Sequence, residues 1–185
     1  MKSSPIRNFL FSALILLLFL GCTKDMITNS YSTEHLVNAY FDPVSSYLPL
    51  QQVLGSPGFG NPGQYCTIRK HSDHITIASA TGSINYSDAI IMKGSLGLGG
   101  LIVGTNYDSE YYVFDLACPN CNQAQYRLTV PFDGTGIVTC NHCKISYDLN
   151  YGTIRSTEGN TIHSNPRSLF RYHIGYTGMS VEFHN

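Results

Sequence analysis

Charged side chains are scarce in this chain of 185 residues, because Asp, Glu, Lys and Arg together make up only 12% of it. The basic residues do not cluster along the sequence, whereas proteins that bind nucleic acid gather Lys and Arg to neutralise phosphates. We therefore expect no nucleic acid among its partners. With so few charges and 13 tyrosines, the surface is expected to be polar but uncharged, which suits an exported β protein.

An apolar run long enough to span a membrane is also missing. The run at the start, residues 9–20, is shorter than the roughly 20 residues that a spanning helix needs. Lys2 and Arg7 precede it and Gly21 follows it, which is the pattern of a cleaved signal peptide. Residues 1–21 are therefore predicted to be removed from the mature protein.

The end of this segment, Leu-Phe-Leu-Gly-Cys at residues 18–22, resembles the lipobox of bacterial lipoproteins. The resemblance implies cleavage before Cys22 and acylation of that cysteine, and two or more acyl chains anchor a protein stably. Thr23, rather than an aspartate, resembles the outer-membrane sorting choice of Gram-negative lipoproteins. We therefore expect a lipid anchor in the bacterial cell envelope, at the outer membrane. Ordinary secretion with Cys22 removed or free is the alternative.

Sustained helical periodicity, internal repeats and low-complexity tracts are absent after the signal peptide. Residues 22–40 are polar without a period and are predicted to form a tether. Beyond them, short segments rich in Ile, Val, Thr and Tyr alternate with turn residues, which predicts strands. The expected strands are 65–70, 74–79, 101–105, 111–116, 125–132, 137–139, 145–149, 153–155, 170–174 and 179–183. The predicted fold class is a single all-β domain, residues 41–185.

Two Cys-x-x-Cys pairs are the strongest chemical signal, Cys118 with Cys121 and Cys140 with Cys143. Each pair follows a predicted strand, and the hairpin between the pairs lets their loops approach each other. Four thiolates at one point suit a tetrahedral metal, and this pattern is typical of zinc sites. Structural Zn(II), a single iron and an all-cysteine 2Fe-2S cluster all fit the ligand set. The signal peptide lacks adjacent arginines, which favours export of the unfolded chain and zinc acquired afterwards.

Disulfides are the alternative use of these cysteines, because thiols pair in an oxidising compartment. Bridges within each pair and bridges across the pairs are both compatible with the sequence. Cys66 lies far upstream, within a predicted strand, and is expected to be a buried free thiol.

The order of these segments resembles the Rieske-type domain family over residues 100–183. The resemblance rests on the strand and loop at 114–119, the loop at 138–143, the segment 147–152 and the strand 169–172. It implies a Rieske-like β sandwich with two metal-binding loops that look like the knuckles of rubredoxins and zinc ribbons. In the family, two cysteines and two histidines hold a 2Fe-2S cluster.

The ligands implied by this resemblance depart from the family's pattern. Cys118 and Cys140 match its cysteines, whereas Asn120 and Cys143 stand where it has histidines. Cys121 would complete an all-cysteine set. A 2Fe-2S cluster held in this way would lack the histidines that raise Rieske potentials, so a low potential is expected.

The remaining polar residues form no catalytic arrangement. His142, inside the second pair, is expected to donate to a sulfur or to face solvent rather than to bind the metal. The other histidines, and Asp115, Asp148 and Glu158, are expected at turns or on the surface, with no Ser-His-Asp or paired-carboxylate set among them. The glycine-rich segment 94–100 lacks the Lys-Ser/Thr ending of a phosphate loop and is expected to be a flexible or bulged connection.

Together these patterns predict metal binding rather than catalysis. The expected function is that of a membrane-anchored lipoprotein whose four cysteines hold a 2Fe-2S cluster for electron transfer or a structural zinc. The alternative is a structural or binding lipoprotein without metal, in which the same cysteines form disulfides.

Overall fold

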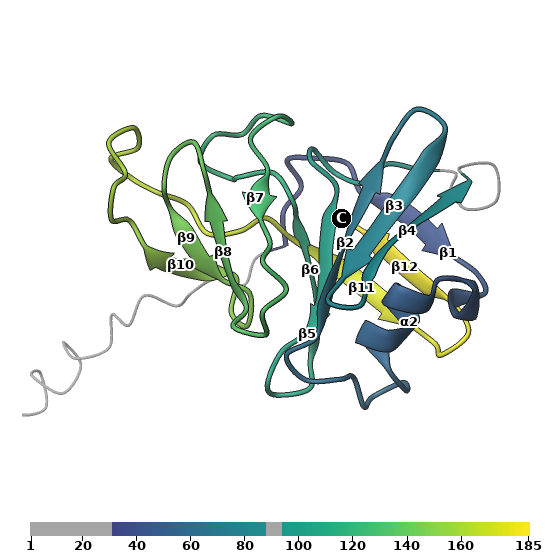
Figure 1. The fold of residues 1–185 in the computed structure, drawn as a ribbon. Coiled ribbons are helices and arrows are strands. Elements are labelled where there is room, and N and C mark those ends of the chain that lie inside the picture. Colours follow the sequence, from purple (N-terminus) through teal and green to yellow (C-terminus); the bar gives the residue numbers. More distant parts are fainter. Residues whose placement is uncertain (1–30, 88–93) are drawn as a thin grey trace, which may run out of the picture. The chain divides into compact units, whose positions relative to one another are not determined.

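Twelve strands, one short α-helix and one 3-10 helix make up the described part of the chain, residues 31–87 and 94–185, in the computed structural model (Figure 1). The all-β fold class predicted from the sequence is confirmed. The predicted signal peptide and Cys22 lie outside the described residues. The strands are β1 (Asn38–Phe41), β2 (Tyr65–Lys70), β3 (His74–Ser79), β4 (Gly82–Ser87), β5 (Leu101–Thr105), β6 (Tyr111–Asp115), β7 (Leu128–Thr129), β8 (Ile137–Cys140), β9 (Ser146–Asp148), β10 (Thr153–Ser156), β11 (Arg171–Tyr176) and β12 (Val181–His184), and the helices are η1 (Val44–Ser46) and α2 (Leu48–Leu54).

The larger sheet has eight antiparallel strands in the order β1-β12-β11-β6-β5-β2-β3-β4. Strands that are consecutive along the chain form its hairpins: β2 pairs with β3, and β3 pairs with β4. Alternate residues of β3, Ile75 and Ile77, are fully buried in the first core, as the two-residue period of a strand requires. Helix α2 covers this core with Leu50, Val53 and Leu54, whose spacing places them on one helical face.

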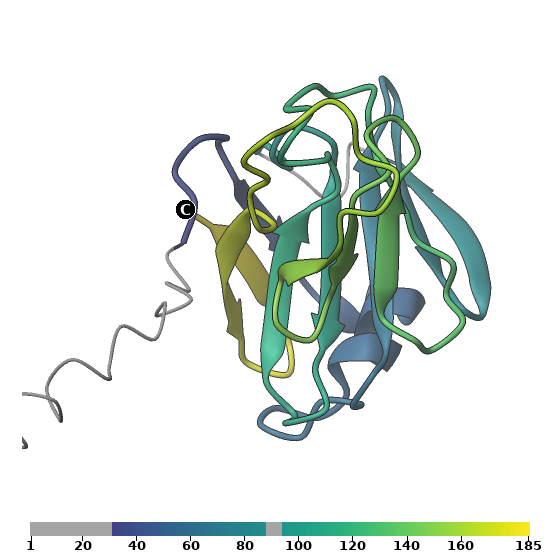
Figure 2. The ribbon, with the colours of Figure 1, turned by 90° about the vertical axis from the view of Figure 1, so that its left-hand side faces the viewer.

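The smaller sheet has four antiparallel strands in the order β10-β9-β8-β7 and packs on the other face of the larger one. Figure 2 shows it in front of the teal strands of the larger sheet. The second core between the sheets contains Ile102 and Phe114 from the larger sheet and Val138 and Tyr147 from the smaller one. Strand β5 is buried on both faces, which explains why its sequence is continuously apolar rather than alternating.

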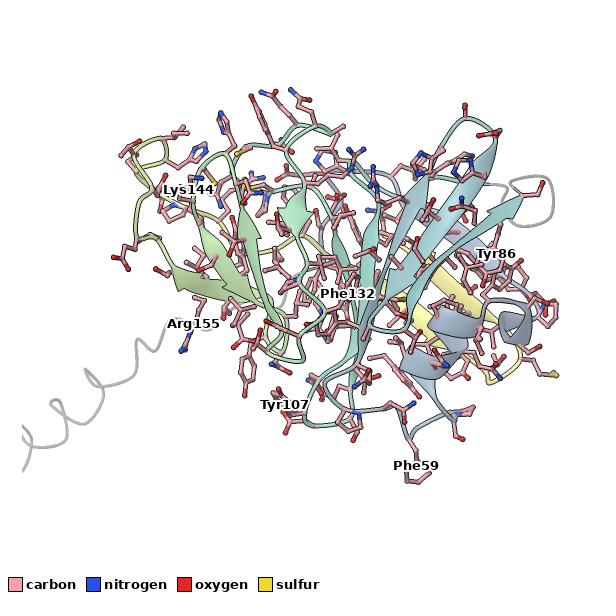
Figure 3. All side chains as sticks on the ribbon, viewed as in Figure 1. Phe59, Tyr86, Tyr107, Phe132, Lys144 and Arg155 are labelled. Carbon is pink, nitrogen blue, oxygen red and sulfur yellow. The ribbon has the colours of Figure 1, made fainter. Side chains whose placement is uncertain are left out.

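The edge of this second core is closed by an aromatic pair. Phe132, labelled in Figure 3, stacks on Tyr65 with ring centroids 5.7 Å apart. Tyr65 is buried in β2, whereas Phe132 belongs to the connection between β7 and β8. The contact therefore ties the long hairpin of the smaller sheet to the larger sheet.

The chain joins the domain earlier than the predicted end of the tether at residue 40. Strand β1 begins at Asn38 and pairs with β12. Upstream of it, Tyr31 stacks on His173 at 3.4 Å, and the backbone N–H of Ser32 donates to the carbonyl of Arg171 at 2.7 Å. Strand β1 is short and contains no β-branched residue, so its sequence gives little indication that it is a strand. Strand β4 and helix α2 were also not predicted from the sequence.

No helix among the described residues is long and apolar enough to cross a bilayer.

Cys66 lies in β2 and is entirely buried as a free thiol, which confirms the sequence-based prediction. Burial raises the pKa of this thiol because an apolar environment disfavours the thiolate. We expect iodoacetamide at about pH 8 to leave Cys66 unmodified in the native protein and to modify it readily in urea. Peptide mass mapping checks this, and rapid labelling under native conditions would contradict it.

Asp115, expected at a turn or on the surface, is instead fully buried at the end of β6. Its carboxylate accepts hydrogen bonds from the backbone N–H groups of Leu98 (2.7 Å), Gly99 (2.9 Å) and Ala117 (2.7 Å) and from the hydroxyl of Tyr172 (2.9 Å). A buried charge is tolerated only with such partners. The glycine-rich connection is therefore held by a specific acceptor, which no local sequence pattern reveals.

Candidate metal centre

The two cysteine loops share one backbone design. In the first loop the N–H of Asn122 donates to the carbonyl of Cys118 at 2.8 Å, and in the second the N–H of Lys144 donates to the carbonyl of Cys140 at 2.8 Å. Asn122 and Lys144 both adopt positive φ, 49° and 64°, which is uncommon outside glycine and closes a tight turn. Each Cys-x-x-Cys pair is thus folded back so that both of its sulfurs point to the same side.

Strand pairing holds the two loops next to each other. Cys118 follows β6, and its N–H donates to the carbonyl of Tyr126 at 2.8 Å. Cys140 is the last residue of β8, where it pairs with Leu128 of β7. The hairpin between the pairs, predicted from the sequence, therefore brings both loops to one end of the smaller sheet, although its first strand is only two residues long.

The four sulfurs of Cys118, Cys121, Cys140 and Cys143 gather at one point, with all Sγ atoms within 4.8 Å of one another. The Sγ atoms of Cys118 and Cys143 are 3.6 Å apart, and those of Cys121 and Cys140 are 3.7 Å apart. A tetrahedral ion with metal–sulfur distances of about 2.3 Å has sulfur–sulfur edges of about 3.8 Å. The sulfurs of the four free thiols are therefore grouped closely enough to hold a metal ion.

The environment of the sulfurs favours the thiolate form of Cys118 and disfavours that of Cys121 and Cys143. Burial raises the pKa of Cys118, but hydrogen bonds from the Tyr147 hydroxyl and from the backbone N–H groups of Cys121 and Asn120 outweigh it, so the net shift is downward. Burial and the nearby negative charge of Cys118 raise the pKa of Cys143 to about 12 and also raise that of Cys121. Like charges this close cannot coexist unaided, so full ionisation of the cluster requires a cation.

Tyr147 and Asn120 fix the inner side of the first loop. The hydroxyl of Tyr147 lies 3.5 Å from the sulfur of Cys118 and accepts a hydrogen bond from the Asn120 amide at 2.6 Å. Burial raises the pKa of Tyr147, so its hydroxyl stays protonated and can donate to the thiolate. Asn120 also exchanges two hydrogen bonds with the backbone of Arg167, of 3.0 and 2.6 Å. Its side chain therefore serves as a structural clamp.

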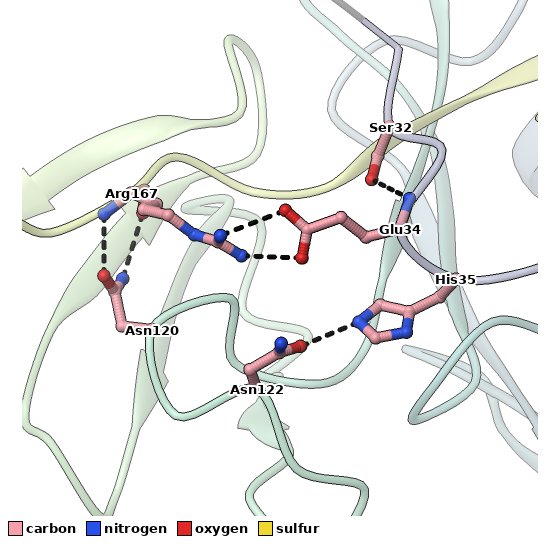
Figure 4. A network of polar contacts seen from close by, with 6 residues as sticks. All are labelled: Ser32, Glu34, His35, Asn120, Asn122 and Arg167. Atoms are coloured by element: carbon pink, nitrogen blue, oxygen red, sulfur yellow. Dashed lines mark hydrogen bonds and ion pairs between the residues drawn. The ribbon is translucent and has the colours of Figure 1, made fainter.

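Residues near the N-terminal end of the domain reach the same loop, as Figure 4 shows. Glu34 and Arg167 form a bidentate ion pair with both contacts at 3.0 Å, and His35 is 2.7 Å from the Asn122 side chain. Both partners of the ion pair are about half exposed, and such pairs contribute only about 0–1 kcal/mol. These contacts orient the first loop more than they stabilise it.

Two histidines approach the half-buried Cys121. His142 is exposed, stacks on Tyr126 at 3.9 Å and places Nδ1 3.4 Å from the Cys121 sulfur, which agrees with its expected position beside a sulfur. His163, expected on the surface, is half-buried with Nε2 3.9 Å from the same sulfur. Asn160 folds the loop that carries it, donating to the carbonyl of His163 at 2.7 Å. His163 is far along the chain from every cysteine, so the sequence alone did not predict its contact with Cys121.

The Asn120 clamp provides a prediction about stability. Replacing Asn120 with alanine removes the hydrogen bond to the buried Tyr147 hydroxyl and both bonds to the Arg167 backbone, and we expect the free energy of unfolding to fall by about 1–3 kcal/mol. Asn141, the second residue of the other Cys-x-x-Cys loop, bonds to Thr129 at an exposed position, so Asn141→Ala is the control with an effect within about 0.5 kcal/mol. Urea unfolding measures both, and equal losses would refute the clamp.

No family model, curated protein or solved structure matches this chain. We therefore base the proposed function on the geometry of the cysteine site.

Proposed function

We propose that the domain binds a single metal ion through Cys118, Cys121, Cys140 and Cys143, and that Zn(II) is this ion. The observation that supports it is the compactness of the four sulfurs, all within 4.8 Å. A 2Fe-2S cluster distributes four thiolates over two irons, so thiolates on different irons lie further apart than one tetrahedron edge. Zinc is the usual ion of closed four-cysteine sites.

The proposed ion has a structural role. Four protein ligands leave no open coordination position, and an open position is what a catalytic zinc needs. The ion would fasten the loop after β6 to the loop after β8, and so join the two sheets at one end of the second core. We infer a zinc-stabilised binding module rather than an enzyme.

The location of the protein in the cell and its family relationship are proposed from the sequence. Residues 1–22 support a lipoprotein anchored in the bacterial envelope at the outer membrane. A divergent Rieske-like relationship is supported by two cysteine loops that follow strands at one end of a small sheet packed on a larger one. In such a relationship, Asn120 stands where the family has a histidine ligand and bonds to the backbone of Arg167 instead.

Low-potential electron transfer is the second candidate. It is favoured by the donors around the sulfurs, namely the Tyr147 hydroxyl and the His142 and His163 rings, since hydrogen bonds to sulfur tune the potential of iron centres. Half-exposed Cys121 would give such a centre a route to a redox partner.

Metal analysis of the full chain, purified without added metal, tests these functions together with a visible spectrum. We expect a colourless protein with zinc equimolar to the chain. Colour with iron equimolar to the chain indicates a mononuclear iron site, and colour with twice that iron indicates the cluster. Absence of metal, together with four loop cysteines that resist alkylation until a reductant is added, would refute metal binding in favour of disulfides.

A further inference from the structure

The glycine-rich connection before β5 lines a polar pocket. The pocket has a volume of about 230 Å³ and is formed by residues 94–100 together with Lys70 and Arg127. This is several times the roughly 30 Å³ that one water molecule occupies in the liquid. The pocket is therefore large enough for a polyatomic ion with the first atoms of whatever carries it.

Glycines are needed here because the backbone of the connection packs directly against the end of β6 and the residues that follow it. A Cβ at Gly97 would collide with the Asp115 carboxylate, and one at Gly99 would lie 2.5 Å from the backbone nitrogen of Ala117. Asp115 holds this inner side through the N–H groups of Leu98 and Gly99. The other side of the same backbone, without bulky side chains at four of its seven positions, forms the wall of the pocket.

Basic side chains from separate parts of the chain converge on this pocket. Lys70 ends β2, and Arg127 precedes β7 and donates through Nε to the carbonyl of Gly99 at 2.9 Å. Arg69 runs beside the pocket wall, with its Cγ 3.4 Å from where a Cβ on Gly100 would be. The fold thus brings together basic residues that do not cluster along the sequence.

Among the described residues, several positive charges lie close together beside this pocket. Burial and the positive charge of Arg69 lower the pKa of Arg127, with Asp115 opposing the shift. The same arginines contribute, after burial and His74, to lowering the pKa of His71. In addition, the buried Nε of Arg69 has no hydrogen-bond partner among the described residues. An anion placed between Lys70 and Arg127 would reduce the repulsion among these cations.

We propose that this pocket binds a phosphate-like oxyanion, free or as an ester, between the glycine-rich wall and the side chains of Lys70 and Arg127. The small volume of the pocket favours a single anionic group over an extended polymer. None of the four clustered cysteines lines this pocket, so the proposal does not rest on the metal site.

Isothermal titration of the full chain in detergent at low ionic strength tests the proposal, with inorganic phosphate and glycerol 3-phosphate as probes. We expect both to bind saturably, and we expect Lys70→Gln and Arg127→Gln each to weaken binding by about tenfold, as the loss of one charge-assisted contact does. Tighter binding of glycerol 3-phosphate assigns the site to phosphate esters such as lipid headgroups. Equal or tighter binding of inorganic phosphate assigns it to the free ion.

Arg155→Gln is the matched control, because Arg155 is an exposed arginine on β10 of the smaller sheet, labelled in Figure 3. It should bind both probes like the native protein. Lys70 is exposed, so Lys70→Gln remains informative if Arg127→Gln, which loses the bond to Gly99, fails to fold. The proposal is overturned if neither probe binds, or if Lys70→Gln binds no more weakly than Arg155→Gln.

Discussion

Replacing Cys118 with serine is expected to abolish stable metal binding and to lower the melting temperature by more than about 10 °C. Structural zinc contributes about 10–16 kcal/mol of apparent binding free energy in zinc-finger peptides, as much as the whole stability of an ordinary domain. Serine is neutral and is not a ligand of structural zinc sites. Because Cys118 is fully buried between the sheets, the substitution also places a polar hydroxyl in the core without the metal that would join the two loops. Metal content and thermal unfolding by circular dichroism measure the effect.

Cys66→Ala is the control for this experiment, since Cys66 is equally buried but lies in the other core. It should retain all of its metal and lose only the packing of one sulfur. A Cys118→Ser protein with native metal content and an unchanged melting temperature would contradict the proposed site.

The neighbours of Cys121 predict that the four positions are not equivalent. Cys121 is the half-buried member of the cluster, and imidazole nitrogens of His142 and His163 lie 3.4 and 3.9 Å from its sulfur. Histidine is also a zinc ligand, so Cys121→Ser should keep weakened binding through one of these rings. Adding His142→Ala and His163→Ala should remove it. Equal loss in Cys118→Ser and Cys121→Ser would show that the rings cannot replace the thiolate.

Local patterns account for the parts of this fold that could be predicted. The strands expected at 65–70, 74–79 and 101–105 coincide with β2, β3 and β5, because β-branched residues and flanking turns specify them within a few positions. The cysteine cluster was predictable for the same reason, since each pair is a local motif and a hairpin joins the two. Strand β4, exposed along most of its length, has no apolar alternation to reveal it.

Long-range contacts account for what the sequence did not show. His163 reaches Cys121 only through the folded loop after β10, and Lys70 and Arg127 line one pocket only because distant parts of the chain come together. Asp115 resembled a polar residue at the end of a strand, and its burial depends on a connection that precedes β5 and on Tyr172 in β11. None of these partners lies within the span that a periodic pattern covers.

Replacing Asp115 with alanine is expected to reduce the free energy of unfolding by about 3–5 kcal/mol, as breaking a buried charged network does. The substitution leaves three backbone N–H groups and one hydroxyl without their acceptor, and each unmet buried donor costs about 1–3 kcal/mol unless the structure relaxes. The substitution should destabilise both the glycine-rich connection and the loop that begins at Cys118, because Asp115 bonds to Leu98 and Gly99 on one side and to Ala117 on the other. Urea unfolding of the metal-loaded protein measures the loss.

Graded variants distinguish the network from simple loss of volume. In Asp115→Asn the amide oxygen can still accept from Gly99 and Ala117, whereas the amide nitrogen cannot accept from Leu98, so a smaller loss of about 1–3 kcal/mol is expected. Tyr172→Phe removes one bond to the carboxylate and should cost about 1.5–3 kcal/mol. Asp108→Asn, at an exposed turn, is the control with an effect within about 0.5 kcal/mol. If Asp115→Ala and Asp115→Asn were equally damaging, the loss would come from the negative charge itself, and the two oxygens would not divide the bonds as the structure describes.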